Sequence, residues 1–291
     1  MKKTLLWIII IIALIMSVGW FSKCAQEKDD EPIIEDNSLN ALLSNASGEY
    51  ELDVDGEVQL VSSGEKTLLG GESVKEIVID GWNEGAIRAI GTGSSIVKAR
   101  NNATLVFRNL TLINNLDAVG GAWWDYLWFG GGVRFENCKI EGSIYITGNA
   151  RAEFENCTFN SIASKTYSVW VADGNASFYG CTFTGYRGLK IHEFEGGDDV
   201  VNVEIDDCLF YKLSEKPGLA IGEFFVNPAE TTIAVRDSRF EDCAPWDSKG
   251  SLVGVSGFYE CDTPLENFNF IKENNSVKID LNDDKYWTKN Y

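Results

Sequence analysis

One six-residue pattern recurs six times along this 291-residue chain and constrains its fold more than any other feature. Its copies begin at residues 107, 135, 154, 178, 205 and 235. Each copy has an apolar residue first, a small or apolar residue fourth, and another apolar residue last. The third residues all tolerate a left-handed backbone. They are Asn109, Asn137, Asn156, Gly180, Asp207 and Asp237. The pattern therefore predicts two short strands that meet at a sharp corner, with apolar residues pointing inward on both sides.

A third apolar segment precedes the corners. Its candidates are residues 143–146, 168–171, 188–191 and 218–221, with a looser match at 251–255. The spacing between copies varies from 19 residues (135 to 154) to 30 residues (205 to 235), which suits a coil whose loops differ in length. Leucine-rich and helical repeats instead hold their period. Stacked coils lie about 4.8 Å apart, so each apolar position should form a ladder of like residues in the core.

Three strands per coil, an Asn-type corner and stacked like residues resemble the right-handed parallel β-helix of the pectate-lyase-like superfamily. The resemblance covers roughly residues 74–265. It implies an all-β fold, namely a single-stranded right-handed parallel β-helix, or solenoid, with three strands per coil. The positions that match lie in the interior of the coils. The resemblance therefore predicts the fold and leaves the activity open.

Four of the seven cysteines occupy the fourth position of the pattern. They are Cys138, Cys157, Cys181 and Cys208, and Cys243 lies outside this ladder. Their spacing contains neither a CxxC motif nor a histidine partner, so we predict no zinc site. Cysteines on neighbouring coils come within disulfide range. Because buried cysteine commonly packs as a small hydrophobic residue, we favour free, stacked thiols over disulfide bonds.

The N-terminus carries an export signal. Lys2 and Lys3 precede an apolar run over residues 5–21, so residues 1–23 are predicted to be a signal peptide or a signal-anchor. Cys24 leaves open a third interpretation, the lipid-modified cysteine of a bacterial lipoprotein. Under each interpretation the remainder of the chain is extracytoplasmic, either secreted or anchored to the membrane through its N-terminal segment.

The rest of the chain divides into two predicted parts. Residues 24–47 are acidic and polar and are expected to form a tether, and residues 48–291 form the β-helix domain. The formal net charge of the chain is −19. A surface with this charge repels the phosphates of nucleic acids, so we predict no nucleic-acid partner.

The outward positions of the third strand are the candidate functional site. The apolar residues on either side of Tyr145, Trp170 and Lys190 must face inward, so these three side chains should point outward on successive coils. Arg187 leads into the same strand and His192 follows it. We predict Arg187, Lys190 and His192 as candidate catalytic residues. Tyr145 and Trp170, with the nearby carboxylates Glu193 and Glu223, are candidate substrate-binding residues.

A second candidate surface is the aromatic segment 122–129, which contains Trp123 and Trp124. It is either a loop that covers the coil or a carbohydrate platform that adds both tryptophans to the substrate-binding set. The first interpretation is structural, and the second makes the segment functional. Exposed tryptophans at this density would otherwise favour aggregation.

Three functions remain open. The first is a module that binds polysaccharide, a cell-surface glycan or another surface partner. The second is a polysaccharide lyase or glycoside hydrolase, and the third is a structural or adhesin stalk. Members of the superfamily it resembles commonly bind polysaccharide along this strand face, and its lyases use an arginine or lysine base with calcium nearby. The complete catalytic motifs of those enzymes are absent, which favours binding. We therefore predict no cofactor, with calcium expected only for a lyase.

Overall fold

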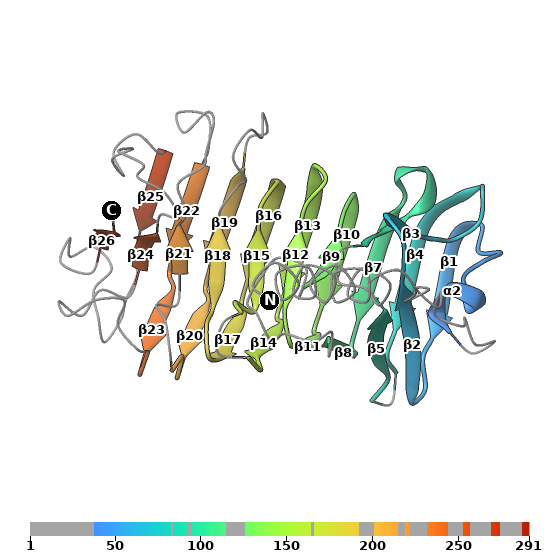
Figure 1. Cartoon of the computed structure of the whole chain (residues 1–291), viewed down its shortest axis with the longest axis horizontal. Helices are drawn as coiled ribbons and strands as arrows, with labels where there is room; N and C mark the ends of the chain where they lie inside the picture. The colour runs from blue at the N-terminus through green and yellow to red at the C-terminus, as the bar shows by residue number, and fades with distance from the viewer. Residues whose placement is uncertain are drawn as a thin grey trace, which may run out of the picture. The chain divides into compact units, whose positions relative to one another are not determined.

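The computed structural model describes residues 38–82, 84–91, 95–114, 126–163, 166–191, 201–214, 219–221, 232–243, 253–256, 269–273 and 287–290. All of them belong to the unit Ile34–Tyr291. Within this unit the strands form three parallel sheets around one interior, with one strand of each sheet in a typical coil (Figure 1). This confirms the predicted all-β solenoid with three strands per coil.

Sheet B, which contains the strand before each corner, has nine strands. They are β1 (Gly48–Asp53), β4 (Val74–Asp80), β7 (Thr104–Arg108), β10 (Gly132–Glu136), β13 (Ala150–Glu155), β16 (Gly174–Tyr179), β19 (Asn202–Asp206), β22 (Thr232–Arg236) and β25 (Asn269–Glu273). Sheet A, which contains the strand after each corner, has eight. They are β2 (Glu57–Ser62), β5 (Ala86–Gly91), β8 (Thr111–Asn114), β11 (Lys139–Glu141), β14 (Thr158–Ser161), β17 (Thr182–Gly185), β20 (Leu209–Tyr211) and β23 (Arg239–Glu241).

Sheet C, formed by the third strands, has nine members. They are β3 (Lys66–Leu69), β6 (Ile96–Ala99), β9 (Leu127–Phe129), β12 (Ile144–Ile146), β15 (Val169–Val171), β18 (Leu189–Ile191), β21 (Leu219–Ile221), β24 (Val253–Ser256) and β26 (Trp287–Asn290). The strands β12, β15, β18, β21 and β24 are the five third-strand candidates found in the sequence. They pair in the expected register, with Ile144 beside Val169 and Val169 beside Leu189.

The corners between sheets B and A have the predicted left-handed residue. The φ angles of the six third-position residues lie between 47° at Asp237 and 61° at Gly180. A left-handed residue turns the chain sharply, and it changes the alternation so that apolar side chains before and after the bend both point inward. The first two coils reach the same geometry differently, for example with Gly56 at φ 82°. Because they lack the six-residue pattern, the repeat detected in the sequence begins later than the fold does.

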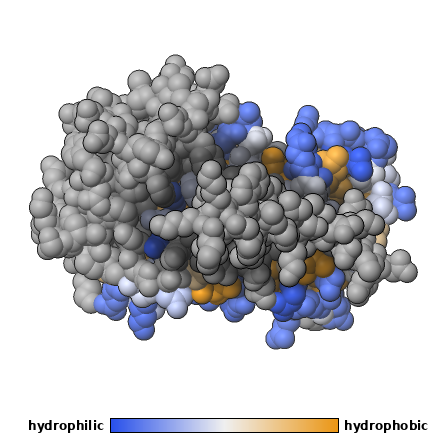
Figure 2. Space-filling model, in the orientation of Figure 1, coloured by the Kyte–Doolittle hydropathy of each residue, from blue (hydrophilic) through white to orange (hydrophobic). Residues whose placement is uncertain are grey.

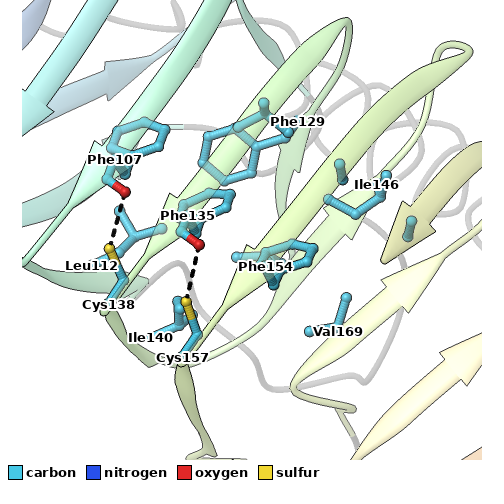
Figure 3. Close-up of a cluster of buried hydrophobic side chains, with 14 of the residues drawn as sticks. Phe107, Leu112, Phe129, Phe135, Cys138, Ile140, Ile146, Phe154, Cys157 and Val169 are labelled. Atoms are coloured by element: carbon cyan, nitrogen blue, oxygen red, sulfur yellow. Dashed lines mark hydrogen bonds between the residues drawn. The ribbon is translucent and has the colours of Figure 1, made fainter. Parts of the chain in front are cut away.

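Stacked phenylalanine rings fill the interior (Figure 3). In the first position of the pattern, Phe135 stacks on Phe107 with ring centroids 4.8 Å apart and on Phe154 at 5.0 Å. In the last position, Phe183 stacks on Phe159 at 4.7 Å and on Phe210 at 4.6 Å. The ring spacings match the distance between coils. The predicted aromatic ladders are therefore confirmed, and all of these rings are buried.

The cysteine ladder consists of buried free thiols. Each thiol donates a hydrogen bond to a backbone carbonyl of the preceding coil, as Cys138 does to Phe107 at 3.3 Å and Cys157 does to Phe135 at 3.4 Å (Figure 3). The same bond gives each thiol a partner and joins consecutive coils. This confirms free thiols at the ladder positions. Cys243 lies outside the ladder, as expected, and donates to the carbonyl of Phe210.

A short helix closes the first coil. The helix α2 (Leu39–Leu42) begins at Ser38, whose hydroxyl accepts a hydrogen bond from the amide of Ala41. Leu39 and Leu43 are fully buried in the interior core. Leu39, Leu43 and Ala46 thus pack with the folded body, within the stretch that the sequence assigned to the tether. Acidic composition around residue 30 obscured the apolar leucines that follow it.

The predicted signal or anchor, residues 1–23, lies outside the described residues, as does the predicted tether up to residue 37. In the part of the chain that the structure describes, no helix is both long and apolar enough to cross a membrane. The export signal and the tether before residue 38 therefore stay predictions from sequence.

Candidate functional site

Three of the predicted site residues share one row on the outer side of sheet C. Tyr145 pairs with Trp170, and Trp170 pairs with Lys190. The row continues in the other direction to Trp128, which pairs with Tyr145. Sequence analysis had placed Trp128 in a loop or platform, but Leu127–Phe129 is strand β9 of a regular coil. Its apolar–aromatic–apolar order repeats that of β12, and the surrounding tryptophans hid this match.

The predicted exposure of this row is wrong. Tyr145, Trp170 and Lys190 expose only 1%, 5% and 4% of their surfaces. Tyr126 packs edge-on against both aromatic rings, and its hydroxyl accepts a hydrogen bond from the amide of Tyr167 at 2.8 Å. We call Tyr126, Trp128, Tyr145, Trp170 and Ala172 the outer aromatic cluster, which is separate from the interior core. Strand alternation shows which side chains point away from the interior, but it does not show whether they reach solvent.

Two cations lie against aromatic rings beside this cluster. The Lys190 amine lies 3.8 Å from the ring centroid of Trp170, and the Arg187 guanidinium lies 5.5 Å from that of Tyr167. Burial, and then the positive charge of Arg187, lower the pKa of Lys190 to about 7. An amine with this pKa has the right strength for a general base near neutral pH. A base must also touch its substrate, and the burial of Lys190 in this structure prevents that contact.

The other predicted site residues, His192, Glu193, Glu223, Trp123 and Trp124, lie outside the described residues. Their roles stay predictions. Among the residues that the structure describes, no group of three or more His, Cys, Asp or Glu side chains is placed to hold a metal ion.

The outer side of sheet B carries a second, more accessible arrangement. Its middle row runs through Arg134, Glu153, Ser177 and Glu204 on four successive strands. Ser177 has a much shorter side chain than the two glutamates beside it, so the surface is hollowed there. Two adjoining hollows of about 440 and 490 Å³ share Glu153 and Ser177 in their linings. We call this depression, which extends over β10, β13, β16 and β19, the sheet B groove.

Arginine–glutamate pairs hold one end of the groove. Arg134 contacts Glu136 and Glu153, each at 3.3 Å, and Arg151 contacts Glu153 at 3.1 Å. Arg108 donates to Glu136 at 2.9 Å. Burial raises the pKa of Glu136, but hydrogen bonds from Arg108 and Arg134 outweigh it, so that this pKa lies below its usual value. Exposed pairs add little stability, about 0–1 kcal/mol each. Their main effect here is to fix the side chains that border the groove.

The remaining lining of the groove offers polar groups and one aromatic ring. The Asn202 amide donates to the Asn175 side-chain oxygen at 3.0 Å, which orders two amides on adjacent coils. Glu155 and Glu204 are exposed, and neither forms an ion pair with another described residue. Tyr179 exposes 53% of its surface. Amides, carboxylates, a hydroxyl and an aromatic ring are thus available to one ligand.

The sheet B groove was not predicted from the sequence, where only the outward positions of the third strand were proposed as a site. The signal was present in the six-residue pattern itself. The second position, and the residue before the first, point outward on sheet B. In the copies that begin at 154, 178 and 205, these positions hold Glu153, Glu155, Ser177, Tyr179, Glu204 and Asp206. Polar residues beside an exposed tyrosine at matched outward positions could have suggested a binding surface.

Comparison with known protein families agrees with this architecture. A family model described as the right-handed β-helix region matches residues 126–287, more than half of the chain. The chain therefore belongs to the right-handed β-helix family. Membership of the pectate-lyase-like superfamily, to which the sequence showed a resemblance, is consistent with this match. Searches of curated proteins and of solved structures found no match.

Proposed function

We propose that this protein binds polysaccharide, either free or on a cell surface, in the sheet B groove. The observation that supports the proposal is the hollow over Ser177, which is bordered by ordered amides, exposed carboxylates and the ring of Tyr179. Amides and carboxylates together can donate to and accept from sugar hydroxyls. An exposed aromatic ring supplies an apolar surface with a polar edge, on which a sugar ring can stack.

The coil architecture suits a polymer. Each outward row of sheet B repeats at the strand spacing of about 4.8 Å, so a chain laid along the solenoid axis meets a polar group on each of the four successive coils of the groove. The groove spans four strands, from Arg134 on β10 to Glu204 on β19. Much of the described surface visible in Figure 2 is hydrophilic, with smaller apolar patches between. The sheet B groove is open and lined by polar groups, which favours an internal segment of a polysaccharide over a small buried ligand.

Filling the groove should weaken binding without disturbing the fold. Ser177 points outward and is partly exposed, so in Ser177→Tyr the new ring can occupy the hollow while the interior stays unchanged. A glycan array would first identify an oligosaccharide, and titration calorimetry would then measure its affinity. We expect Ser177→Tyr to weaken binding at least about tenfold, or roughly 1.4 kcal/mol.

Thr158→Tyr is the matched control for this experiment. Thr158 is an exposed, outward hydroxyl residue on sheet A, so its substitution adds the same ring away from the groove. It should leave affinity unchanged. If Ser177→Tyr binds the oligosaccharide as tightly as Thr158→Tyr does, the ligand lies elsewhere and the groove assignment fails.

A polysaccharide lyase or glycoside hydrolase is the alternative with less support. Lys190, the best candidate base, is buried against Trp170. The same glycan experiment tests this alternative, since product release from a bound oligosaccharide would indicate catalysis. A purely structural stalk would bind none of the glycans.

We also propose that residues 24–291 lie outside the cytoplasm. Lys2 and Lys3 before the apolar run 5–21 support this orientation. Protease added to intact cells, or to spheroplasts if an outer membrane is present, should digest the domain while a cytosolic marker survives. Protection equal to that of the marker would contradict the placement.

A further inference from the structure

The carboxylates that line the sheet B groove differ in how they are neutralised. Glu136 and Glu153 are each held by two arginines. Glu155 and Glu204, both exposed, form no ion pair with any residue in the described part of the chain. The groove therefore contains two negative charges that none of the described residues neutralises in an ion pair.

These two carboxylates lie on either side of Ser177, the residue over which the two hollows meet. Glu155 is on β13 and Glu204 is on β19, and the strand between them, β16, carries Ser177 and Tyr179. Glu155 lines one of the two hollows and Glu204 lines the other, so a ligand that spans both hollows over Ser177 lies between the two charges. The ring of Tyr179 borders the same space, and the face of an aromatic ring also attracts a cation.

The charge pattern discriminates among sugars. An acidic polysaccharide would meet Glu155, Glu204 and a chain of net charge −19, while Arg134 and Arg151 are already engaged with glutamates. A neutral polysaccharide would remove water from two carboxylates without supplying a counter-charge, which is costly. A sugar that carries ammonium groups avoids both the repulsion between like charges and the loss of water from carboxylates that gain no counter-charge.

We infer that the sheet B groove recognises an amino polysaccharide, that is, a polymer of sugars with free amino groups, and prefers it to the N-acetylated form. This inference rests on the proposed function, because it assigns the ligand class of the same groove. The ammonium groups contact Glu155 and Glu204, and the sugar ring between them packs beside Tyr179.

The test compares two probes that differ only at the sugar nitrogen, a glucosamine hexamer with free ammonium groups and an N-acetylglucosamine hexamer with neutral acetamido groups, by titration calorimetry with the whole protein. We expect the glucosamine hexamer to bind more tightly, and the preference to shrink as salt screens the charges. Glu155→Gln and Glu204→Gln should each reduce the affinity for the glucosamine hexamer by up to about fivefold, the range of exposed ion pairs. The double variant should lose most of the preference.

Glu51→Gln is the matched control. Glu51 is exposed and belongs to the same outward row as Glu153, but it lies on β1, four strands away. The Glu51→Gln substitution removes the same charge at a position far from the groove, so this variant should keep the preference for the glucosamine hexamer. An equal loss in Glu51→Gln would show that only net charge matters, and would overturn the assignment of Glu155 and Glu204.

Failure of this inference is distinguishable from failure of the proposed function. If both hexamers bind equally tightly and Ser177→Tyr weakens the binding of both at least about tenfold, the groove binds sugar but the inferred preference for amino sugars is wrong. If Ser177→Tyr leaves the affinities for both hexamers unchanged, the assignment of the binding site to the sheet B groove is wrong. Pentalysine serves as a further probe, and binding as tight as that of the glucosamine hexamer would show that the groove recognises cations rather than amino sugars.

Discussion

Replacing Phe183 with alanine is expected to lower the free energy of unfolding by about 3–5 kcal/mol, the usual cost of truncating a buried phenylalanine. Phe183 has no exposed surface and stacks between Phe159 and Phe210 with centroid distances of 4.7 and 4.6 Å. Because the strands on both sides are fixed by parallel pairing, neighbouring coils cannot collapse fully into the cavity. Denaturant unfolding of the two proteins measures the difference.

Thr182→Ala is the control for Phe183→Ala. Thr182 is the adjacent residue on β17, but its side chain points outward and is partly exposed. Its truncation should change stability by less than about 0.5 kcal/mol. A loss below about 1 kcal/mol for Phe183→Ala would show that this ring is not part of the core ladder.

Replacing Trp170 with alanine should be comparably destabilising, by about 3 kcal/mol or more. The sequence alone predicted an exposed stacking anchor whose loss affects a ligand. In the structure, Trp170 instead packs against Tyr145 and Tyr126 at centroid distances of 5.3 and 5.6 Å and against the Lys190 amine. Its removal leaves a cavity in the outer aromatic cluster and takes away the ring beside a buried amine.

An exposed aromatic residue provides the comparison for Trp170→Ala. Tyr179 is also outward-facing but exposes 53% of its surface, so Tyr179→Ala should change the unfolding free energy by no more than about 0.5 kcal/mol. Equal effects on stability for the two variants would contradict the burial of Trp170. In that case the outer aromatic cluster would again be a candidate ligand surface, as the sequence suggested.

Local backbone chemistry made the coils predictable. A left-handed residue at Asn109 or Asn137, followed directly by a small or apolar residue and three positions on by another apolar residue, requires the same corner in every coil where it occurs. Strand alternation then fixed which residues of β12, β15 and β18 point inward. These are short-range rules that act within one coil, so a single sequence was sufficient to apply them.

The candidate site depended on contacts that these rules do not describe. The outward direction of Tyr145 and Trp170 followed from alternation, but their burial depends on Tyr126, which is distant from Trp170 in sequence. The sheet B groove arises because a short side chain, Ser177, lies between Glu153 and Glu204 on neighbouring coils. Such a hollow is visible only when the register of three coils is known.

A crystal structure of the protein with a bound amino oligosaccharide would test the central claim, that the sheet B groove is the glycan site, most directly. We expect an oligosaccharide that crosses β13, β16 and β19 over Ser177, with a sugar ring against Tyr179 and amino groups near Glu155 and Glu204. An oligosaccharide bound instead against sheet C, with the sheet B groove empty, would contradict it.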